Sequence, residues 1–406
     1  MSPTGKIMDF RLLVFFSCTC LVLNTMAFMT ITPVLPILFN EWNLTETEGG
    51  LLGGAFFIGY VTSVPILVTL TDRIIPKKIY IFSGFVGAAS CFGFACLAHD
   101  LWTGVLFRML TGVGVAGTYM PALKALVDSL EEPERSKASG YYTSVYAIGT
   151  AISILTAGYV TEYWGWELAF FVAGIGICFA LIIGMIVLPR GIVTERTQGQ
   201  LADFKRVFRN RPVMINITAY FGHLWEVFAN RVWIVTFLVF AESAQPGSFL
   251  ISVTWLATLI ALIGVPASMF CAELAVRYGR ELVIRGSMLI AVIVGVAVAF
   301  TTGSPLWVIG ILALAYGMTS YSDTGTINTA TVVTAEPEVR GATMAVHASV
   351  GFLGGVLGSL AIGMTLQATG GKDSQEAWTF AFLVMAAGSA FGFLVRWWFG
   401  REHHRL

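Results

Sequence analysis

The stretch LLVFFSCTCLVLNTMAFMTITPVLPIL, residues 12–38, contains no charged side chain and is the first of twelve long apolar runs. A helix needs about twenty apolar residues to cross a hydrocarbon layer of about 30 Å. Backbone groups in lipid must bond within their own segment, so each run is expected to be a helix. We place the runs at 12–38, 49–70, 79–98, 102–129, 139–162, 168–188, 214–241, 248–270, 282–302, 306–335, 342–367 and 377–398. The sequence thus predicts an all-α integral membrane protein with twelve transmembrane helices.

Composition supports this class and excludes others. The 406 residues are 56% hydrophobic and 12% charged, whereas soluble domains carry roughly 25% charged residues. A net charge of zero argues against a nucleic-acid partner. The six cysteines lie in or beside apolar runs, which favours free packing thiols over disulfides or metal ligands. We expect no metal, no cofactor, membrane lipids as neighbours, and a monomer.

The placement of basic residues predicts the orientation. With the N-terminus in the cytoplasm, 20 of the 24 Lys and Arg residues fall in cytoplasmic loops, tails or span ends. Only Lys372 faces the other side, and Arg108, Lys124 and Arg231 lie within runs. This is the positive-inside pattern, so both termini are expected in the cytoplasm. The run at 12–38 is too long for a signal-peptide core. Short loops favour a bacterial inner membrane.

Two short motifs repeat at the same interval. Glu132-Pro133-Glu134 follows the fourth run and Glu336-Pro337-Glu338 follows the tenth, 204 residues later. Arg73 and Arg277, after the second and eighth runs, are again 204 apart. Equal offsets indicate two parallel six-helix pseudo-repeats. We divide the chain into an N-terminal bundle at 1–188, a cytoplasmic linker at 189–213 and a C-terminal bundle at 214–406.

The linker contains a candidate amphipathic helix. Leu201, Phe204, Val207 and Phe208 would share one apolar face, with basic residues around it. We prefer a helix lying on anionic lipid to a plain linker.

Five full charges lie in the interior of the runs, and they fall on three runs only. The fourth carries Arg108 and Lys124, the seventh Glu226 and Arg231, and the tenth Asp323. Each costs about 2.5–3.5 kcal/mol on insertion scales. Such residues must therefore face a shared polar interior rather than lipid.

Helical spacing groups polar neighbours with these charges. His223, Glu226 and Asn230 are three and four residues apart and share a helix face, with Arg231 on its flank. In the tenth run Tyr316, Ser320, Asp323 and Thr324 fall close to one stripe. These residues are candidates for substrate binding or proton coupling.

Loop and span motifs resemble the major facilitator superfamily. The loop Thr71–Lys78 is similar to its acidic-basic signature, although the expected glycine before the basic pair is missing. The loop Glu273–Arg280 keeps Arg-x-Gly-Arg, with Val276 in place of the acid. Arg108, followed by glycines in the fourth run, is similar to the family's arginine-plus-glycine motif. The resemblance implies two six-helix halves around a cavity lined by helices 1, 4, 7 and 10, to which helix 1 contributes Asn24.

Each candidate has a structural alternative. Arg108 could bind substrate, or pair with helix carbonyls. Glu226 and Asp323 could carry protons, or form structural salt bridges. Lys124 could be a gate or a snorkelling residue, and His223 and His347 are more often packed histidines. With both acids ionised, the interior charge sums to +1, which favours a small organic anion.

Cytoplasmic loop charges suggest gating parts. Asp72 and Arg73, together with Arg135, can form an ion-pair network that holds the two halves together. The resemblance adds Arg277 to this latch, although the positive-inside bias explains Arg277 almost as well.

We therefore expect a secondary active transporter that moves a small-molecule substrate by alternating access, with protons as coupling ion, in symport or antiport. A proton-antiport efflux pump for amphipathic or drug-like compounds is an alternative. A fifth run without the glycine-proline pair of many drug antiporters weakens it. A receptor or sensor with a transporter fold is a second alternative. No phosphate-binding loop is present, and His223 with Glu226 lacks a third zinc ligand, so neither ATP drive nor an enzyme is expected.

Overall fold

The computed structural model describes residues 9–71, 73–191 and 204–399, and the regular structure in these residues is helical. The first group of helices comprises α1 (Phe10–Thr25), α2 (Ile31–Glu41), α3 (Glu46–Leu70), α4 (Pro76–Leu97), α5 (Leu101–Val127), α6 (Glu134–Trp164) and α7 (Trp166–Val187). After the short α8 (Phe204–Arg209), the second group comprises α9 (Arg211–Ser243), α10 (Val253–Tyr278), α11 (Arg280–Phe300), α12 (Leu306–Tyr321), α13 (Thr324–Thr334), the 3-10 turn η1 (Pro337–Val339), α14 (Arg340–Ala368) and α15 (Gln375–Phe399).

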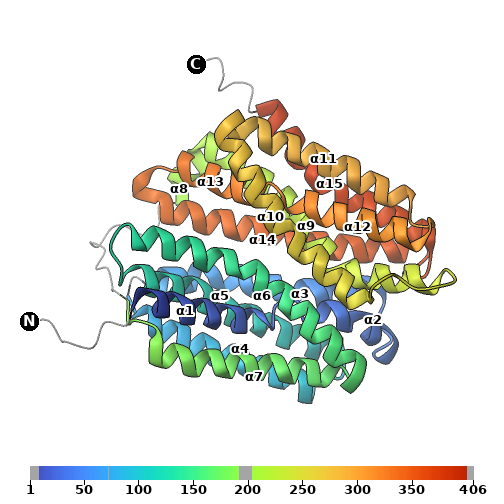
Figure 1. Ribbon diagram of the computed structural model, residues 1–406, viewed down its shortest axis with the longest axis horizontal. Coiled ribbons are helices and arrows are strands. Elements are labelled where there is room, and N and C mark those ends of the chain that lie inside the picture. Colours follow the sequence, from blue (N-terminus) through green and yellow to red (C-terminus); the bar gives the residue numbers. More distant parts are fainter. Residues whose placement is uncertain (1–8, 72, 192–203, 400–406) are drawn as a thin grey trace, which may run out of the picture.

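The two groups lie against each other along their length, α1–α7 below and α9–α15 above in Figure 1. We call them the N-terminal set and the C-terminal set. Helix α1 begins and α15 ends at the same end of the molecule, at the left of Figure 1, which we call the terminal end. The opposite end, where α2 lies, is the distal end.

Ten helices in the described part of the chain are long and apolar enough to cross a membrane. The other two predicted runs are each divided, 12–38 between α1 and α2 and 306–335 between α12 and α13. Pro33 has no N–H to donate to the carbonyl of Met29, and its ring would clash with that carbonyl, which favours a break in the helix before this residue. At the second break, Ser322 and Thr324 donate side-chain hydrogen bonds to the carbonyls of Thr319 and Tyr321, an alternative to helix bonding.

The two sets meet most closely along α3 and α14. A Cβ atom added to Gly50 would lie 2.6 Å from the carbonyl oxygen of Ser359, so only glycine fits there. Further toward the middle, Phe57 stacks on Phe228 with ring centroids 4.4 Å apart. Small residues let helices approach backbone to backbone, and this contact is the main seam between the sets.

Three hydrogen bonds join the sets within the described residues. Thr47 N donates to Gln367 Oε1, Lys372 N donates to Glu46 Oε1, and Thr32 Oγ1 donates to the carbonyl oxygen of residue 231. Two of them lie at the distal end, where α3 begins and α14 ends, and the third lies near the middle, in the first turn of α2. The two sets are therefore closed against each other at the distal end along α3 and α14.

The linker helix α8 docks on the C-terminal set. Val207 is buried against a cluster that includes Val213 and Val339, and Arg206 forms ion pairs with Glu336 and Glu338. Phe208 is exposed, and Leu201 lies outside the described residues. The predicted apolar face is thus shared between a protein contact and the surface.

Candidate functional site

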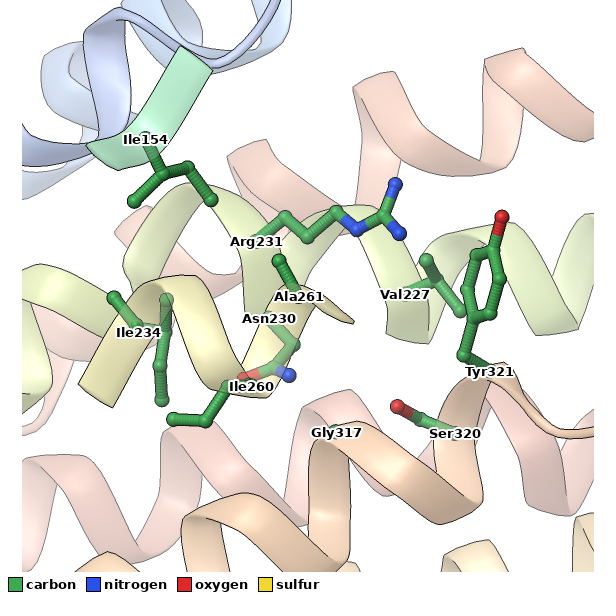
Figure 2. A pocket seen from close by; sticks show the side chains of 11 residues that line it. Ile154, Val227, Asn230, Arg231, Ile234, Ile260, Ala261, Gly317, Ser320 and Tyr321 are labelled. Atoms are coloured by element: carbon green, nitrogen blue, oxygen red, sulfur yellow. The ribbon is translucent and has the colours of Figure 1, made fainter. Parts of the chain in front are cut away.

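A small cavity lies between the sets, where α6 faces α9, α10 and α12 (Figure 2). Its polar lining comes from Asn230, Arg231, Ser320 and Tyr321, and the remaining walls are apolar or glycine. The cavity offers about 20 Å³ to the centre of a water-sized sphere, which is room for one or two waters. In this conformation it is too small for an organic solute.

Arg231 is the charged residue of this cavity. Its side chain is buried and extends toward the ring of Tyr321 (Figure 2), with the guanidinium carbon 4.8 Å from that ring's centroid and 6.0 Å from that of Phe228. No acidic side chain in the described residues forms an ion pair with it. Aromatic faces offset part of the cost of a buried cation, but an uncompensated charge in the interior still costs several kcal/mol. The cavity therefore presents a positive charge without an anion.

A second polar group surrounds the break between α12 and α13. His223 Nδ1 lies 2.8 Å from Asp323 Oδ1, an ion-pair distance at which the angle is not that of a hydrogen bond. His223 Nε2 is 2.9 Å from Thr324 Oγ1. Both His223 and Asp323 are almost fully buried, and Asp323 Oδ2 has no hydrogen-bond partner. The break between α12 and α13 thus brings a histidine and a carboxyl group together in the interior of the C-terminal set.

Glu226 is one turn along α9 from His223 and is fully buried. Ser389 of α15 donates a hydrogen bond to Glu226 Oε2, and Tyr316 lies beside the carboxyl. Glu226 Oε1 has no hydrogen-bond partner, and no basic group of the described residues pairs with Glu226. The C-terminal set therefore contains two buried carboxyl groups in different surroundings, one beside a histidine and one beside hydroxyl groups.

The polar group extends toward the terminal end through aromatic rings. Tyr220 stacks on His347 with centroids 3.9 Å apart and on His223 at 5.7 Å. His347 in turn contacts Asn328 Oδ1 at 2.8 Å and Thr331 Oγ1 at 3.3 Å. Polar side chains thus continue from the break at Asp323 along α13 within the C-terminal set.

The two N-terminal candidates serve the packing of that set. Arg108 donates from Nη1 to the carbonyl of Ala27 and from Nη2 to that of Phe28, both at 2.9 Å, and its guanidinium lies over the ring of Phe56. These carbonyls belong to the break between α1 and α2. Asn24 donates to the carbonyl of Cys20 and to the Tyr80 hydroxyl. Neither residue lines the cavity.

The gating candidates that the structure describes are the basic residues Arg73, Lys124, Arg135 and Arg277. Asp72 lies outside the described residues. Arg73 and Arg277 are exposed and form no ion pair with any described residue. Arg135 donates from Nε to the carbonyls of residues 127 and 130, so it caps the end of α5. Lys124 forms an ion pair with Asp128 at 2.9 Å.

The sequence pattern thus identified polar side chains that are in contact in the structure, but it did not identify all of their hydrogen-bond partners. The face through His223, Glu226 and Asn230 points into the protein, as the spacing predicts. Ser389 could not be recognised from the sequence as a partner of Glu226, because it is a lone serine in an apolar run. Arg396 looked like a basic span end, yet it is buried and bonded to Asn216 and Glu281.

Comparisons with known proteins agree with this architecture. A family model described as Major Facilitator Superfamily matches residues 17–359 and 247–406. The crystal structure of a bacterial homolog to the human lysosomal transporter Spinster, in an inward-facing and unoccupied conformation, superposes with a TM-score of 0.78. That match has 18% sequence identity and covers 96% of this chain and 98% of the other.

Curated relatives match parts of the chain. A probable sphingolipid transporter, spinster homolog 1 of Arabidopsis thaliana, is 25% identical over 49% of this chain and 43% of its own length. The sialic acid transporter NanX of Escherichia coli is 23% identical over 49% of this chain and 51% of its own length. The chain thus spans about half the length of these relatives.

The chain belongs to the major facilitator superfamily. Its relatives and its fold are those of membrane transporters rather than enzymes. It is therefore a multi-pass integral membrane protein of a transporter family, as the apolar runs and loop motifs predicted.

Proposed function

We propose that the chain is a secondary active transporter of a small organic anion. The observation that supports this proposal is the environment of Arg231, which lines the cavity between the two sets. Its guanidinium is buried and has no acidic partner among the described residues. An anion in this cavity would supply the missing charge, while the apolar walls would accept its hydrocarbon part.

The transport cycle proposed here is a rocking of the N-terminal set against the C-terminal set. The divided runs 12–38 and 306–335 complete twelve spans, and both termini lie in the cytoplasm of a bacterial inner membrane. With this orientation the distal closure along α3 and α14 corresponds to a conformation closed to the outside. Opening of the cavity toward the terminal end would release or admit the anion.

Protons are the proposed coupling ion. Glu226 and the His223–Asp323 pair are buried one to two turns from Arg231 on or beside α9, so one helix links both groups to the anion site. Protonation of either carboxyl would change the charge that the anion meets in the interior. The latch of Asp72, Arg73 and Arg277 remains a proposal for the conformation that is closed on the cytoplasmic side.

The anion site is tested by binding and uptake. We would measure thermal shifts of the purified protein with benzoate and with N-acetylneuraminate, and then uptake of the stabilising anion into proteoliposomes. Arg231→Gln should abolish uptake, whereas Arg231→Lys should keep part of it because the charge remains. Equal uptake by wild type and Arg231→Gln would refute the anion site.

Coupling is tested with a pH gradient across the same vesicles. Asp323→Asn or Glu226→Gln should abolish gradient-driven uptake and leave folding intact. Glu376→Gln, an acid in the first turn of α15, serves as control. Reversal of the gradient distinguishes symport from antiport. Wild-type pH dependence in both variants would exclude these carboxyl groups as proton carriers.

A further inference from the structure

Four polar side chains line the cavity at Arg231, and none of them forms a hydrogen bond with another described residue. Asn230 and Arg231 come from α9, and Ser320 and Tyr321 come from the end of α12. Asn230, Arg231 and Ser320 are each more than nine-tenths buried. Buried polar groups are almost always bonded to protein, water or a ligand. Four such groups around one small space therefore point to a bound species.

The atoms that these side chains present to the cavity are mainly donors. Asn230 Oδ1 is fully buried, so the amide presents its NH₂ group instead. The guanidinium of Arg231 carries five N–H donors and no acceptor, and the hydroxyl groups of Ser320 and Tyr321 can each donate. Figure 2 shows Asn230 and Ser320 facing each other from α9 and α12. A species bound here has to accept hydrogen bonds from several sides.

The charge of the lining selects among acceptors. No acidic side chain lines the cavity. The nearby carboxyl groups are engaged inside the C-terminal set, Asp323 against His223 and Glu226 with Ser389. A water molecule would accept hydrogen bonds but would leave the guanidinium charge uncompensated, at a cost of several kcal/mol. A small anion supplies both the acceptor and the charge.

The size of the cavity limits the anion to a single small ion. The cavity offers about 20 Å³ to the centre of a water-sized sphere, and a halide ion is little larger than a water molecule. Ile154 of α6 closes the side toward the N-terminal set, and the other walls are apolar side chains or glycine. A carboxylate with a hydrocarbon body does not fit while the two sets are closed on the cavity.

We propose that the cavity at Arg231 binds one halide ion, with chloride as the abundant one, in the closed conformation. The donors all belong to the C-terminal set, and Ile154 of the N-terminal set covers the ion. Separation of the sets exposes the ion to solvent, where an organic anion can displace it from Arg231. This exchange rests on the proposed transport function, whereas the binding of chloride does not.

Binding is measured on the full-length purified protein with radiolabelled chloride at constant ionic strength. We expect saturable binding of one chloride per chain, which bromide displaces. Sulfate is larger and doubly charged, so it should not displace chloride at the same ionic strength. Non-saturable binding, or equal displacement by sulfate and bromide, overturns the proposal.

Variants place the bound ion. Arg231→Gln should weaken chloride binding about tenfold or more, because a charge-assisted bond and the compensated charge are both lost. Ser320→Ala keeps the charge and removes one neutral donor, so it should weaken binding about threefold. The matched control is Arg285→Gln, which removes an arginine of the same set that lies over Phe393 and outside the cavity. Unchanged binding in both cavity variants, or an equal loss in the control, refutes the site.

Competition separates this site from the proposed transport function. With an organic anion that the protein takes up, chloride should raise the KM for uptake and leave the maximal rate unchanged. A protein that binds chloride at Arg231 but moves no organic anion would keep the halide site and refute only the transport proposal. Uptake that depends on Arg231 in a protein without saturable chloride binding would keep the transport proposal and overturn the halide site.

Discussion

The two sets of helices are interrupted in complementary places. In the N-terminal set the first run is divided into α1 and α2, and α5 is continuous; in the C-terminal set α9 is continuous and the fourth run is divided into α12 and α13. In each set the continuous helix contacts the break. Arg108 of α5 donates to the carbonyls of Ala27 and Phe28, and His223 of α9 lies against Asp323 and Thr324.

The difference lies in the chemistry of the two contacts. An arginine side chain stays charged under ordinary conditions, so its hydrogen bonds to backbone carbonyls do not change with pH. A histidine beside an aspartate can change charge with a single proton. We infer that the N-terminal break is a fixed structural element, while the C-terminal break can respond to protonation. Two variants test this contrast directly, and two more compare the breaks with the seam between the sets and with the start of α5.

The largest effect is expected from Arg108→Met. It leaves two buried carbonyl groups without donors and removes a packed side chain, for a loss of about 3 kcal/mol or more in the free energy of unfolding. The melting temperature should fall by roughly 4 °C, equally at pH 6 and pH 8. Arg108→Lys should recover part of the loss. An unchanged melting temperature in the methionine variant would contradict a bracing role.

His223→Gln should lower the stability less than Arg108→Met does, and it should change the pH dependence of transport more. Glutamine can keep one hydrogen bond at the break, so we expect a loss of about 1–2 kcal/mol. In proteoliposomes the ratio of uptake rates at pH 6 and pH 8 should approach one. A ratio equal to that of wild type would mean that the C-terminal break is as fixed as the N-terminal one.

Gly50→Ala tests the seam between the sets rather than either break. The added methyl group meets the carbonyl of Ser359, and such overpacking costs about 1–3 kcal/mol. The control is Gly140→Ala in α6, where a Cβ atom meets nothing within 4 Å. It should stabilise the helix by up to about 1 kcal/mol. Melting curves that move in the same direction in both variants would refute a tight seam.

The smallest effect is expected at the start of α5. Asp100 accepts hydrogen bonds from the Thr103 backbone and hydroxyl at 2.8 Å, which lowers the pKa of its carboxyl below the ordinary 3.8. Because the folded pKa lies below the unfolded one, this stabilisation is present above pH 4 and is lost as the pH falls through the folded value. The corresponding helix α12 begins at Leu306, and Pro305 before it provides no side-chain cap.

Asp100→Ala should therefore lower the melting temperature by about 2 °C or less at pH 7. The difference from wild type should shrink as the pH falls from 4 through the folded pKa of Asp100. A difference that does not shrink with falling pH would mean that the carboxylate is not the source of the stabilisation.

The sequence predicted the helical class, the family and the buried face of α9, because apolar length and three-to-four spacing are local properties. It did not predict the two breaks. Pro33 and Pro36 were visible in the sequence, but an apolar run with prolines can be kinked or divided. The second break has no proline, and depends on the side chains of Ser322 and Thr324 competing for backbone carbonyls.

The hydrogen-bond partners of the charged side chains were harder to predict than the burial of these side chains. The cost of a charge in lipid indicated that Arg108 faces the interior, yet its acceptors are carbonyl groups about 80 residues away in the chain. Arg231 and Arg108 look alike in sequence, as single arginines within apolar runs. Only tertiary contacts distinguish the arginine with two carbonyl acceptors from the one that lines a cavity.

The hydrogen bond from Thr32 to the carbonyl of residue 231 has a mechanical consequence. Thr32 belongs to α2, the short segment beyond the break that Arg108 holds in place. On the proposed anion site, an anion that draws the Arg231 guanidinium toward itself would also displace the backbone to which Thr32 is bonded. This hydrogen bond would then transmit the displacement from the C-terminal set to the braced break of the N-terminal set.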